Sequence, residues 1–345
     1  MQKKIISFAL VVLSLPIVFS CQNENILQIQ DSQLIDAYGK KKAKKDDWFL
    51  RLPEELKPYY SEAQGKIGAE LFNSLHDIIS RNNNMESYTK TRAFLFTNVD
   101  IAFNRKRNQS GVIDAYSQIF VPGSGELVEG YKENGDENKD TYADDIINAE
   151  HTWPQSFYGS SLPMVSDLHS LQTVLRMPNV MRSDFPFGEV KNDITYSTVC
   201  GSKLSVLDSQ GKPVTYKKAK KYAEDMLEKT KKPVKNTIEP TPPPAGDYRG
   251  VFEPCNDQKG NTARNMLYFY LRYHDMSIRQ GSYNADNFWK SKVKMFMRWS
   301  EFVDLPDSRE MQRNNTIFVK QGNRNPFVDI PDLPSIIGEE PFLNN

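Results

Sequence analysis

Cysteine and histidine are scarce in this chain. Its 345 residues include three cysteines and four histidines. No cysteine cluster has the spacing of a zinc site, and no HExxH motif occurs. A G-x-S-x-G elbow and a glycine-rich phosphate loop are missing too. The chemistry of the protein must therefore come from residues outside these motifs.

A net charge is missing as well. The 44 lysines and arginines balance the 44 aspartates and glutamates. The chain as a whole has no net positive charge that would attract a polyanion, so a nucleic-acid site would have to come from local clusters of basic residues. The hydrophobic fraction is 39% and the aromatic fraction is 11%. A chain of this composition and length is not disordered and can bury one large core.

Long apolar runs are absent except at the N-terminus. There, Lys3 and Lys4 precede an apolar run over residues 5–19, followed by Ser20 and Cys21. The run is too short for a typical membrane-spanning helix and is typical of a secretory signal. We predict a lipoprotein signal peptide over residues 1–20 and lipidation of Cys21, which would anchor an exported protein on the periplasmic face or the cell surface. Plain secretion with an unmodified Cys21 is the alternative.

A polar segment follows the predicted signal. Residues 21–51 include the charge run "GKKKAKKDD", which is typical of a solvated tether. Direct attraction of DNA by its lysines is the alternative interpretation. The folded domain is expected over residues 52–345. It holds Cys200 and Cys255, which form either a disulfide or two separate buried thiols.

Periodicity predicts several helices and one strand. An amphipathic helix is expected within residues 58–80, where Ile67, Leu71, Leu75, Ile78 and Ile79 recur at helical spacing. A strand is expected over residues 111–120, and a helix over 166–178, capped by Ser166 or Asp167. Further helices are expected over 215–232, 261–276 and 286–302, and a stiff proline-rich loop over 239–246. The expected fold class is α+β, a mainly helical single domain.

Six polar residues between positions 150 and 182 are the candidates for chemistry. They are Glu150, His151, Asp167, His169, Asn179 and Arg182. Carboxylate and amide oxygens are ligands that suit magnesium. A nearby neutral imidazole can accept a proton from water. The set therefore favours hydrolysis assisted by a hard metal ion.

These residues belong to a longer pattern. The segments "NAEHTWPQSF" and "SDLHSLQTVLRMPNVMRSDFPFGEV" resemble the bacterial endonuclease I family, in which N-x-E-H-x-W-P is followed by S-D-L-H, an asparagine, an arginine and Y/F-P-F-G. The blocks "FEPCNDQKGNTARNMLYFYLRY" and "QGNRNPFVDIPDL" resemble later segments of the same family. The resemblance covers residues 55 to 335.

The resemblance implies a secreted, sequence-nonspecific endonuclease on a ββα-metal (His-Me finger) core. Glu150 and Asn179 match the family's metal ligands, and His151 matches its general base. One Mg²⁺ per site is implied, with Mn²⁺ or Ca²⁺ as alternatives. DNA is the expected substrate and RNA a second one, and the expected state is a monomer. A catalytically inactive nucleic-acid-binding lipoprotein on the same fold, and a carbohydrate-binding lipoprotein suggested by the aromatic content, are the rival interpretations.

The supporting residues carry two interpretations each. Arg182 is expected to be a catalytic phosphate clamp, because a guanidinium grips phosphate oxygens bidentately; an ion pair with Asp184 or a helix cap is the alternative. Asn148 is expected to orient the loop around the site, and a direct part in the reaction is the alternative. Asp167 is either a helix cap or a ligand. His169 either orients a ligand from a second layer or is structural.

Overall fold

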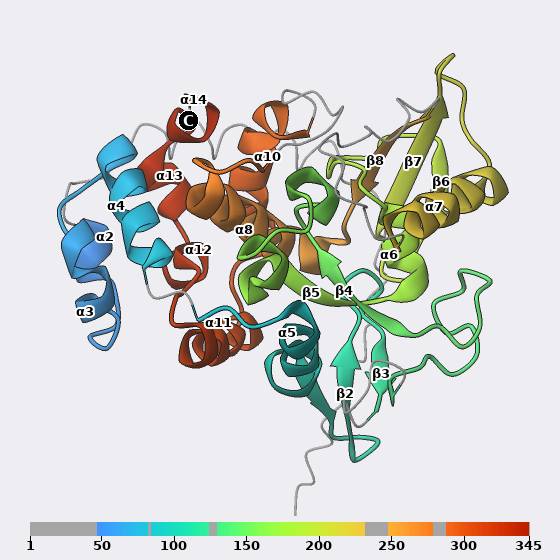
Figure 1. Cartoon of the computed structure of the whole chain (residues 1–345), viewed down its shortest axis with the longest axis horizontal. Coiled ribbons are helices and arrows are strands. Elements are labelled where there is room, and N and C mark those ends of the chain that lie inside the picture. Colours follow the sequence, from blue (N-terminus) through green and yellow to red (C-terminus); the bar gives the residue numbers. More distant parts are fainter. Residues whose placement is uncertain (1–46, 82–83, 124–129, 232–247, 279–287, 345) are drawn as a thin grey trace, which may run out of the picture. The chain divides into compact units, whose positions relative to one another are not determined.

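Short antiparallel strands and longer helices make up the structure (Figure 1). The computed structural model describes residues 47–81, 84–123, 130–231, 248–278 and 288–344. Within them the strands form three antiparallel sheets, ordered β1-β2-β3, β4-β5 and β6-β7-β8. The strands are β1 (Ile101–Asn104), β2 (Gln109–Ile113), β3 (Phe120–Pro122), β4 (Ile147–His151), β5 (Leu171–Leu175), β6 (Ile194–Ser197), β7 (Lys203–Asp208) and β8 (Tyr248–Glu253).

Helices contribute most of the regular structure in the described ranges, which confirms the expected α+β class. The α-helices are α2 (Asp47–Leu50), α3 (Lys57–Tyr60), α4 (Gly68–Ser80), α5 (Tyr88–Phe94), α6 (Arg176–Arg182), α7 (Tyr216–Lys231), α8 (Asn256–Tyr273), α10 (Val293–Arg298), α11 (Ser308–Gln321), α12 (Pro326–Asp329), α13 (Leu333–Ile337) and α14 (Pro341–Asn344). Two π-helical segments, Leu95–Val99 and Trp299–Val303, extend α5 and α10.

The β4–β5 pair and helix α6 follow one another and pack together. The two strands pair from Ile147 opposite Leu175 to His151 opposite Leu171. Helix α6 begins at the residue after β5, and the Arg176 amide donates to the Ile146 carbonyl at 2.6 Å. The start of α6 therefore lies beside the start of β4 (Figure 1). This strand–strand–helix succession holds the predicted metal ligands and base.

The predicted helix over residues 166–178 is wrong. Its middle is strand β5, in which every residue is buried. Pairing with β4 satisfies the backbone of this apolar stretch, so the sheet outweighs local helix propensity. Asp167 caps only a single 3₁₀ turn, Leu168–Ser170. Pro178 does not end a helix but lies in the first turn of α6, where no amide donor is needed.

The predicted strand over residues 111–120 is interrupted by a turn. Strand β2 ends at Ile113 and β3 begins at Phe120. Between them the Asp114 carboxylate accepts hydrogen bonds from the amides of Tyr116 and Ser117, at 3.2 and 2.8 Å. Aspartate stabilises turns in this way, and its effect was missed in the sequence.

Most other predicted helices are confirmed. Helix α4 buries Leu71, Leu75, Ile78 and Ile79, although Ile67 precedes the helix and is 38% exposed. Helices α7 and α8 occupy the expected segments, and α8 is almost entirely buried. The proline-rich segment 239–246 lies outside the described residues.

Aromatic packing against α8 holds the end of β4 in place. Trp153 is fully buried and stacks on Phe269, with ring centroids 5.1 Å apart. Its indole nitrogen donates to the Ile278 carbonyl at 2.8 Å. A buried aromatic ring with a satisfied polar atom is a rigid anchor. The chain therefore leaves the predicted site along a fixed path.

The fold begins before residue 52. Trp48 and Phe49 of α2 are buried, and the Trp48 indole donates to the Lys66 carbonyl at 3.1 Å. The last residues of the predicted tether therefore belong to the folded unit. Residues 1–46, with the predicted signal peptide and Cys21, lie outside the described residues. No helix within the described part of the chain is long and apolar enough to cross a membrane.

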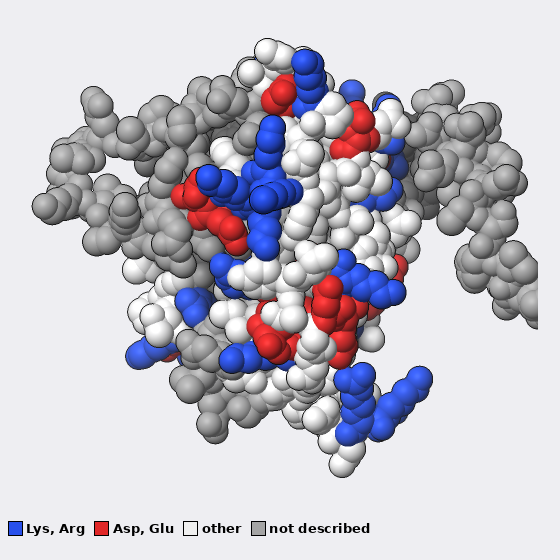
Figure 2. Space-filling model, turned by 90° about the vertical axis from the view of Figure 1, so that its right-hand side faces the viewer, with Lys and Arg blue, Asp and Glu red and all other residues white. Residues whose placement is uncertain are grey.

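Charged side chains are unevenly distributed on the surface. Figure 2 shows basic and acidic side chains in separate groups on one face. Helix α7 exposes Lys217, Lys218 and Lys221. The tip of the β1–β2 hairpin exposes the basic residues 105–107. The balanced composition thus conceals local basic clusters of the kind that contact phosphates.

Replacement of Trp48 tests the N-terminal boundary of the fold. We expect Trp48→Ala to lower the free energy of unfolding by about 3 to 5 kcal/mol, because removal of the buried indole leaves a cavity. Leu50→Ala in the same helix is the control. Leu50 is 67% exposed, and its loss should change stability by less than about 0.5 kcal/mol. Urea denaturation of both variants measures the difference, and equal effects would contradict the assignment of α2 to the fold.

Candidate active site

Glu150 lies at the centre of the β4–β5–α6 region. Its carboxylate is 3% exposed. The Tyr116 hydroxyl donates to Glu150 Oε1 at 2.7 Å, and Arg182 Nη1 lies 3.1 Å from the same oxygen. The second oxygen, Oε2, has no hydrogen-bond partner among the described residues. One half of the carboxylate is thus held by protein groups and the other half is left open.

Burial and the neighbouring side chains shift the pKa of Glu150 in opposite directions. Burial raises the pKa of Glu150 above its usual range, because a buried carboxylate loses its hydration. The positive charge of Arg182 and the Tyr116 hydroxyl act in the opposite direction and favour the ionised form. A second cation at the open oxygen would favour ionisation further. The ionised carboxylate is therefore suited to bind a cation.

His151 is buried with a defined orientation. Its Nε2 lies 3.0 Å from the Val165 carbonyl. A carbonyl oxygen only accepts, so Nε2 must carry the proton and Nδ1 holds the lone pair. The ring of Tyr88 lies 5.3 Å away. Burial lowers the pKa of His151 to about 4, against the opposing effect of the Val165 hydrogen bond. The ring is neutral at pH 7 and can accept a proton.

Arg182 is turned into the protein. Its side chain is 1% exposed and its guanidinium lies 4.4 Å from the centre of the Phe187 ring. Nη2 donates to the Thr152 carbonyl at 2.7 Å and Nη1 to the His151 carbonyl at 3.1 Å. Its ion pair is with Glu150. The structure therefore gives Arg182 a positioning role on β4, and its predicted contact with substrate phosphate stays a prediction.

The two predicted asparagines lie on the same strand–helix unit. Asn179 is in the middle of α6, one turn before Arg182, and is half-buried. Its side chain makes no hydrogen bond to the described residues. Asn148 is half-buried on β4, opposite Val174. Because Arg182 reaches Glu150 from α6, the helix that carries Asn179 packs directly over the strand that carries Glu150.

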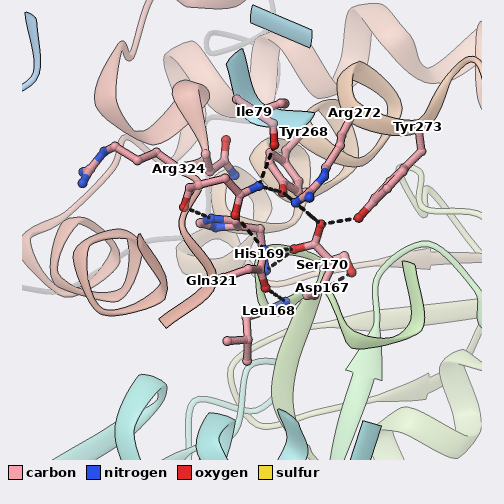
Figure 3. Close-up of polar contacts among 12 residues, drawn as sticks. Ile79, Asp167, Leu168, His169, Ser170, Tyr268, Arg272, Tyr273, Gln321 and Arg324 are labelled. Carbon is pink, nitrogen blue, oxygen red and sulfur yellow. Dashed lines mark hydrogen bonds and ion pairs between the residues drawn. The ribbon is translucent and has the colours of Figure 1, made fainter. Parts of the chain in front are cut away.

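Asp167 is a hub of buried hydrogen bonds (Figure 3). It is fully buried and makes an ion pair with Arg272 at 2.9 Å. Its Oδ2 also accepts from the hydroxyls of Tyr268 and Tyr273, and its Oδ1 accepts from the His169 amide and the Gln321 side chain. Although burial raises the pKa of Asp167, Arg272 and the other donors lower it below its usual range. This carboxylate has no open oxygen and is structural.

His169 is a satisfied structural histidine. Its Nε2 donates to the Asn323 carbonyl at 3.0 Å, and its ring packs against Tyr268. Burial lowers the pKa of His169 to about 3, so the ring is neutral. It lines a polar cavity of about 390 Å³ between β5, α8 and α11, together with Gln172. Glu150, His151 and Asn179 do not line this cavity.

One residue at the site was missed in the sequence. Tyr116 reaches Glu150 from the turn between β2 and β3, and its side chain is fully buried. No local pattern links it to a residue 34 positions later in the chain. Only the packing of the β1–β2–β3 sheet against β4–β5 brings the two together, so a single sequence held no signal for it.

The two cysteines lie side by side and are free. Cys200 is half-buried and its thiol donates to the Tyr116 carbonyl at 3.0 Å. The Cys255 thiol beside it lowers the pKa of Cys200 to about 6, whereas the pKa of Cys255 itself is raised. They are therefore adjacent rather than separate thiols. Of the two alternatives that the sequence left open, the structure shows two thiols and not a disulfide.

Known proteins similar to this chain are nucleases. The chain is 25% identical over 288 residues to the "Extracellular ribonuclease" of Bacillus amyloliquefaciens, which covers 81% of this chain and 77% of that protein. It is 26% identical over 287 residues to the "Extracellular ribonuclease" of Bacillus subtilis (strain 168), with coverage of 79% and 76%.

The family assignment is more specific. A family model described as Endonuclease I matches residues 67–228 and 228–332. These segments span well over half of the chain, which therefore belongs to the endonuclease I family, as its sequence blocks predicted. Both the family and the names of the relatives make the chain a nuclease, an enzyme of the hydrolase class.

The Asp167 hub generates a prediction on stability. We expect Asp167→Asn to lower the free energy of unfolding by about 3 to 5 kcal/mol, because it leaves the buried Arg272 without a counter-ion. Asp332→Asn is the control, since Asp332 pairs with Arg51 at a site where both side chains are more than a third exposed. That change should cost less than about 1 kcal/mol. Urea denaturation compares them, and similar losses would argue against a structural role for Asp167.

Proposed function

We propose that this chain is a secreted, divalent-metal-dependent endonuclease that hydrolyses phosphodiester bonds of DNA and RNA without sequence specificity. The observation that carries the proposal is the open half of the Glu150 carboxylate, whose other oxygen is bound by Arg182 of α6, the helix that also carries Asn179. Membership in the endonuclease I family supports it. The N-terminal signal and the names of the extracellular relatives support export, and Cys21 is the proposed lipid anchor.

The residues at the site fit a hard metal ion. Glu150 Oε2 and the Asn179 side chain are oxygen donors that no other described residue occupies. Such oxygens suit Mg²⁺, with Mn²⁺ and Ca²⁺ as alternatives. We propose that Glu150 and Asn179 hold one ion. When bound, the ion would neutralise negative charge on the scissile phosphate and on the leaving 3′ oxygen.

His151 has the properties of the general base. Its Nδ1 lone pair is available because Nε2 is committed to the Val165 carbonyl. We propose that Nδ1 takes the proton from the attacking water. Attack on phosphorus with loss of the 3′ oxygen leaves a 5′-phosphate and a 3′-hydroxyl. Arg182 and Tyr116 position Glu150 for this step, since both contact the oxygen that faces away from the proposed ion.

Low sequence specificity follows from the contacts that basic surface side chains can make with the phosphates of the substrate. The exposed lysines of α7 and the basic tip of the β1–β2 hairpin can contact phosphates. Phosphate contacts carry no sequence information directly. Helix α7 packs on α6, which places its lysines near the helix of Asn179. We propose that the protein acts as a monomer on nucleic acid.

Loss of the proposed base tests the mechanism. We expect the protein without residues 1–21 to nick supercoiled plasmid DNA and to cleave RNA in Mg²⁺, and to do neither in EDTA. His151→Ala should reduce the rate by about 10² to 10⁴, the usual contribution of a general base. His76→Ala is the control and should retain activity, because the contacts of His76 are with Leu271, His274 and Asp275 and not with Glu150 or His151.

Two outcomes would count against the proposal. A folded wild type that binds DNA but never cleaves it with any divalent metal would favour the inactive binding protein. Undiminished cleavage by His151→Ala would remove His151 from the mechanism. Cleavage of RNA alone would narrow the substrate without changing the chemistry.

The Tyr116 hydrogen bond to Glu150 generates a separate prediction. We expect Tyr116→Phe to raise the Mg²⁺ concentration for half-maximal nicking by about 10- to 100-fold, since partners of metal ligands orient them. The rate at saturating Mg²⁺ should change less. Tyr131→Phe is the control, because the Tyr131 hydroxyl is buried and donates to the Phe96 carbonyl instead. An unchanged Mg²⁺ requirement in Tyr116→Phe would contradict the positioning role.

A further inference from the structure

The loop before β4 is closed at its base and rich in carboxylates. Lys132 and Ile146 form an isolated β-bridge, and the Glu133 amide donates to the Asp145 carbonyl at 2.7 Å. The loop reads "KENGDENKDTYADDI", with acidic side chains at six positions. Three of them, Asp136, Glu137 and Asp144, are exposed. The other three, Glu133, Asp140 and Asp145, are turned inward, with 1%, 4% and 1% exposure.

Two of the inward carboxylates have an oxygen without a partner. Glu133 Oε1 accepts from the Asn138 amide at 2.7 Å, and Asp145 Oδ2 accepts from the Met177 amide at 3.2 Å. Glu133 Oε2 and Asp145 Oδ1 are buried and make no hydrogen bond within the described residues. Buried polar groups are almost always satisfied, so each orphan oxygen requires an explanation.

The three carboxylates are close enough to repel one another. Burial raises the pKa of Asp145 to about 8, and the charges of Asp140 and Glu133 raise it as well. Burial likewise raises the pKa of Glu133 to about 7, with Asp140 adding to the effect. Neither Glu133 nor Asp145 makes an ion pair within the described ranges. Buried charges are normally paired with a side chain or coordinate a metal.

We propose that the loop of residues 132–146 binds one Ca²⁺ through Glu133 Oε2 and Asp145 Oδ1. Peptide carbonyls and water would complete the coordination, and the charge of Asp140 would add attraction. No three His, Cys, Asp or Glu side chains converge into a ready-made site in the described part of the chain, so the site is assigned two carboxylate ligands. Ca²⁺ accepts six to eight oxygens in flexible geometry, whereas Mg²⁺ requires a strict octahedron.

The site would stabilise the catalytic region without belonging to it. Asp145 bonds to the Met177 amide, and the Ile146 carbonyl accepts from the Arg176 amide. Both amides belong to the first turn of α6. The loop also leads directly into β4. A cation at Asp145 would therefore hold the strand of Glu150 and the helix of Asn179 in register, independently of any metal bound by those two residues.

Thermal unfolding in Ca²⁺ and in EDTA tests the proposal. We expect millimolar Ca²⁺ to raise the melting temperature of the wild type by about 5 °C, the shift that a well-occupied site produces. Glu133→Gln and Asp145→Asn should each lose the part of this shift that does not depend on Glu150. In EDTA both should melt no lower than the wild type, because they remove an uncompensated buried charge. Asp144→Asn, an exposed neighbour, should keep the full shift.

A further variant separates this site from the catalytic one. Glu150→Gln should keep the Ca²⁺ shift, and calorimetric titration of Glu150→Gln with Ca²⁺ should still show one bound ion. Loss of the shift in Glu150→Gln would overturn the proposal, and so would its retention when Glu133→Gln or Asp145→Asn is combined with Glu150→Gln. So would a wild type that Ca²⁺ does not stabilise, since the carboxyls would then be protonated. Neither the thermal unfolding nor the calorimetric titration depends on nuclease activity.

Discussion

The buried ion pair between Arg182 and Glu150 is the interaction on which the site depends. Removing both charges from water is costly, and only close geometry offsets that cost. Here the guanidinium also binds two carbonyls at the end of β4, so the pair fixes helix and strand together. Asn179 lies one turn earlier on the same helix. The ion pair therefore fixes the helix that carries Asn179 against the strand that carries Glu150.

Two further supports come from distant parts of the chain. Tyr116 joins the β1–β2–β3 sheet to Glu150, and Asp167 joins the segment before β5 to α8 and α11. Neither contact touches the other. The strand pair and the segment before β5 are thus held by one hydroxyl and one carboxylate from separate parts of the chain. A site of this kind tolerates little movement, which suits the proposed reaction, since this would require an ion, a base and a phosphate in fixed relation.

The sequence predicted what local periodicity determines. Helix α4 followed from the spacing of Leu71 and Leu75, and α8 from its continuous apolar and aromatic face. Strand β5 was mistaken for a helix because Leu171 to Leu175 reads equally well in either form until its partner is known. The candidate residues Glu150, His151 and Asn179 came from family blocks. The contacts of Tyr116 and Arg182 with Glu150 arise only from tertiary packing, and no local sequence pattern indicates them.

The hydrogen bond from His151 to Val165 has an evolutionary consequence. The partner of Nε2 is a main-chain carbonyl, so the tautomer of the proposed base is set by the path of the backbone. A side-chain partner could be lost by one substitution. Here residue 165 can change identity while the 3₁₀ turn in which it lies, Met164–Ser166, keeps its carbonyl in place. The tautomer of His151 is therefore maintained by the fold, and a substitution at residue 165 leaves it unchanged.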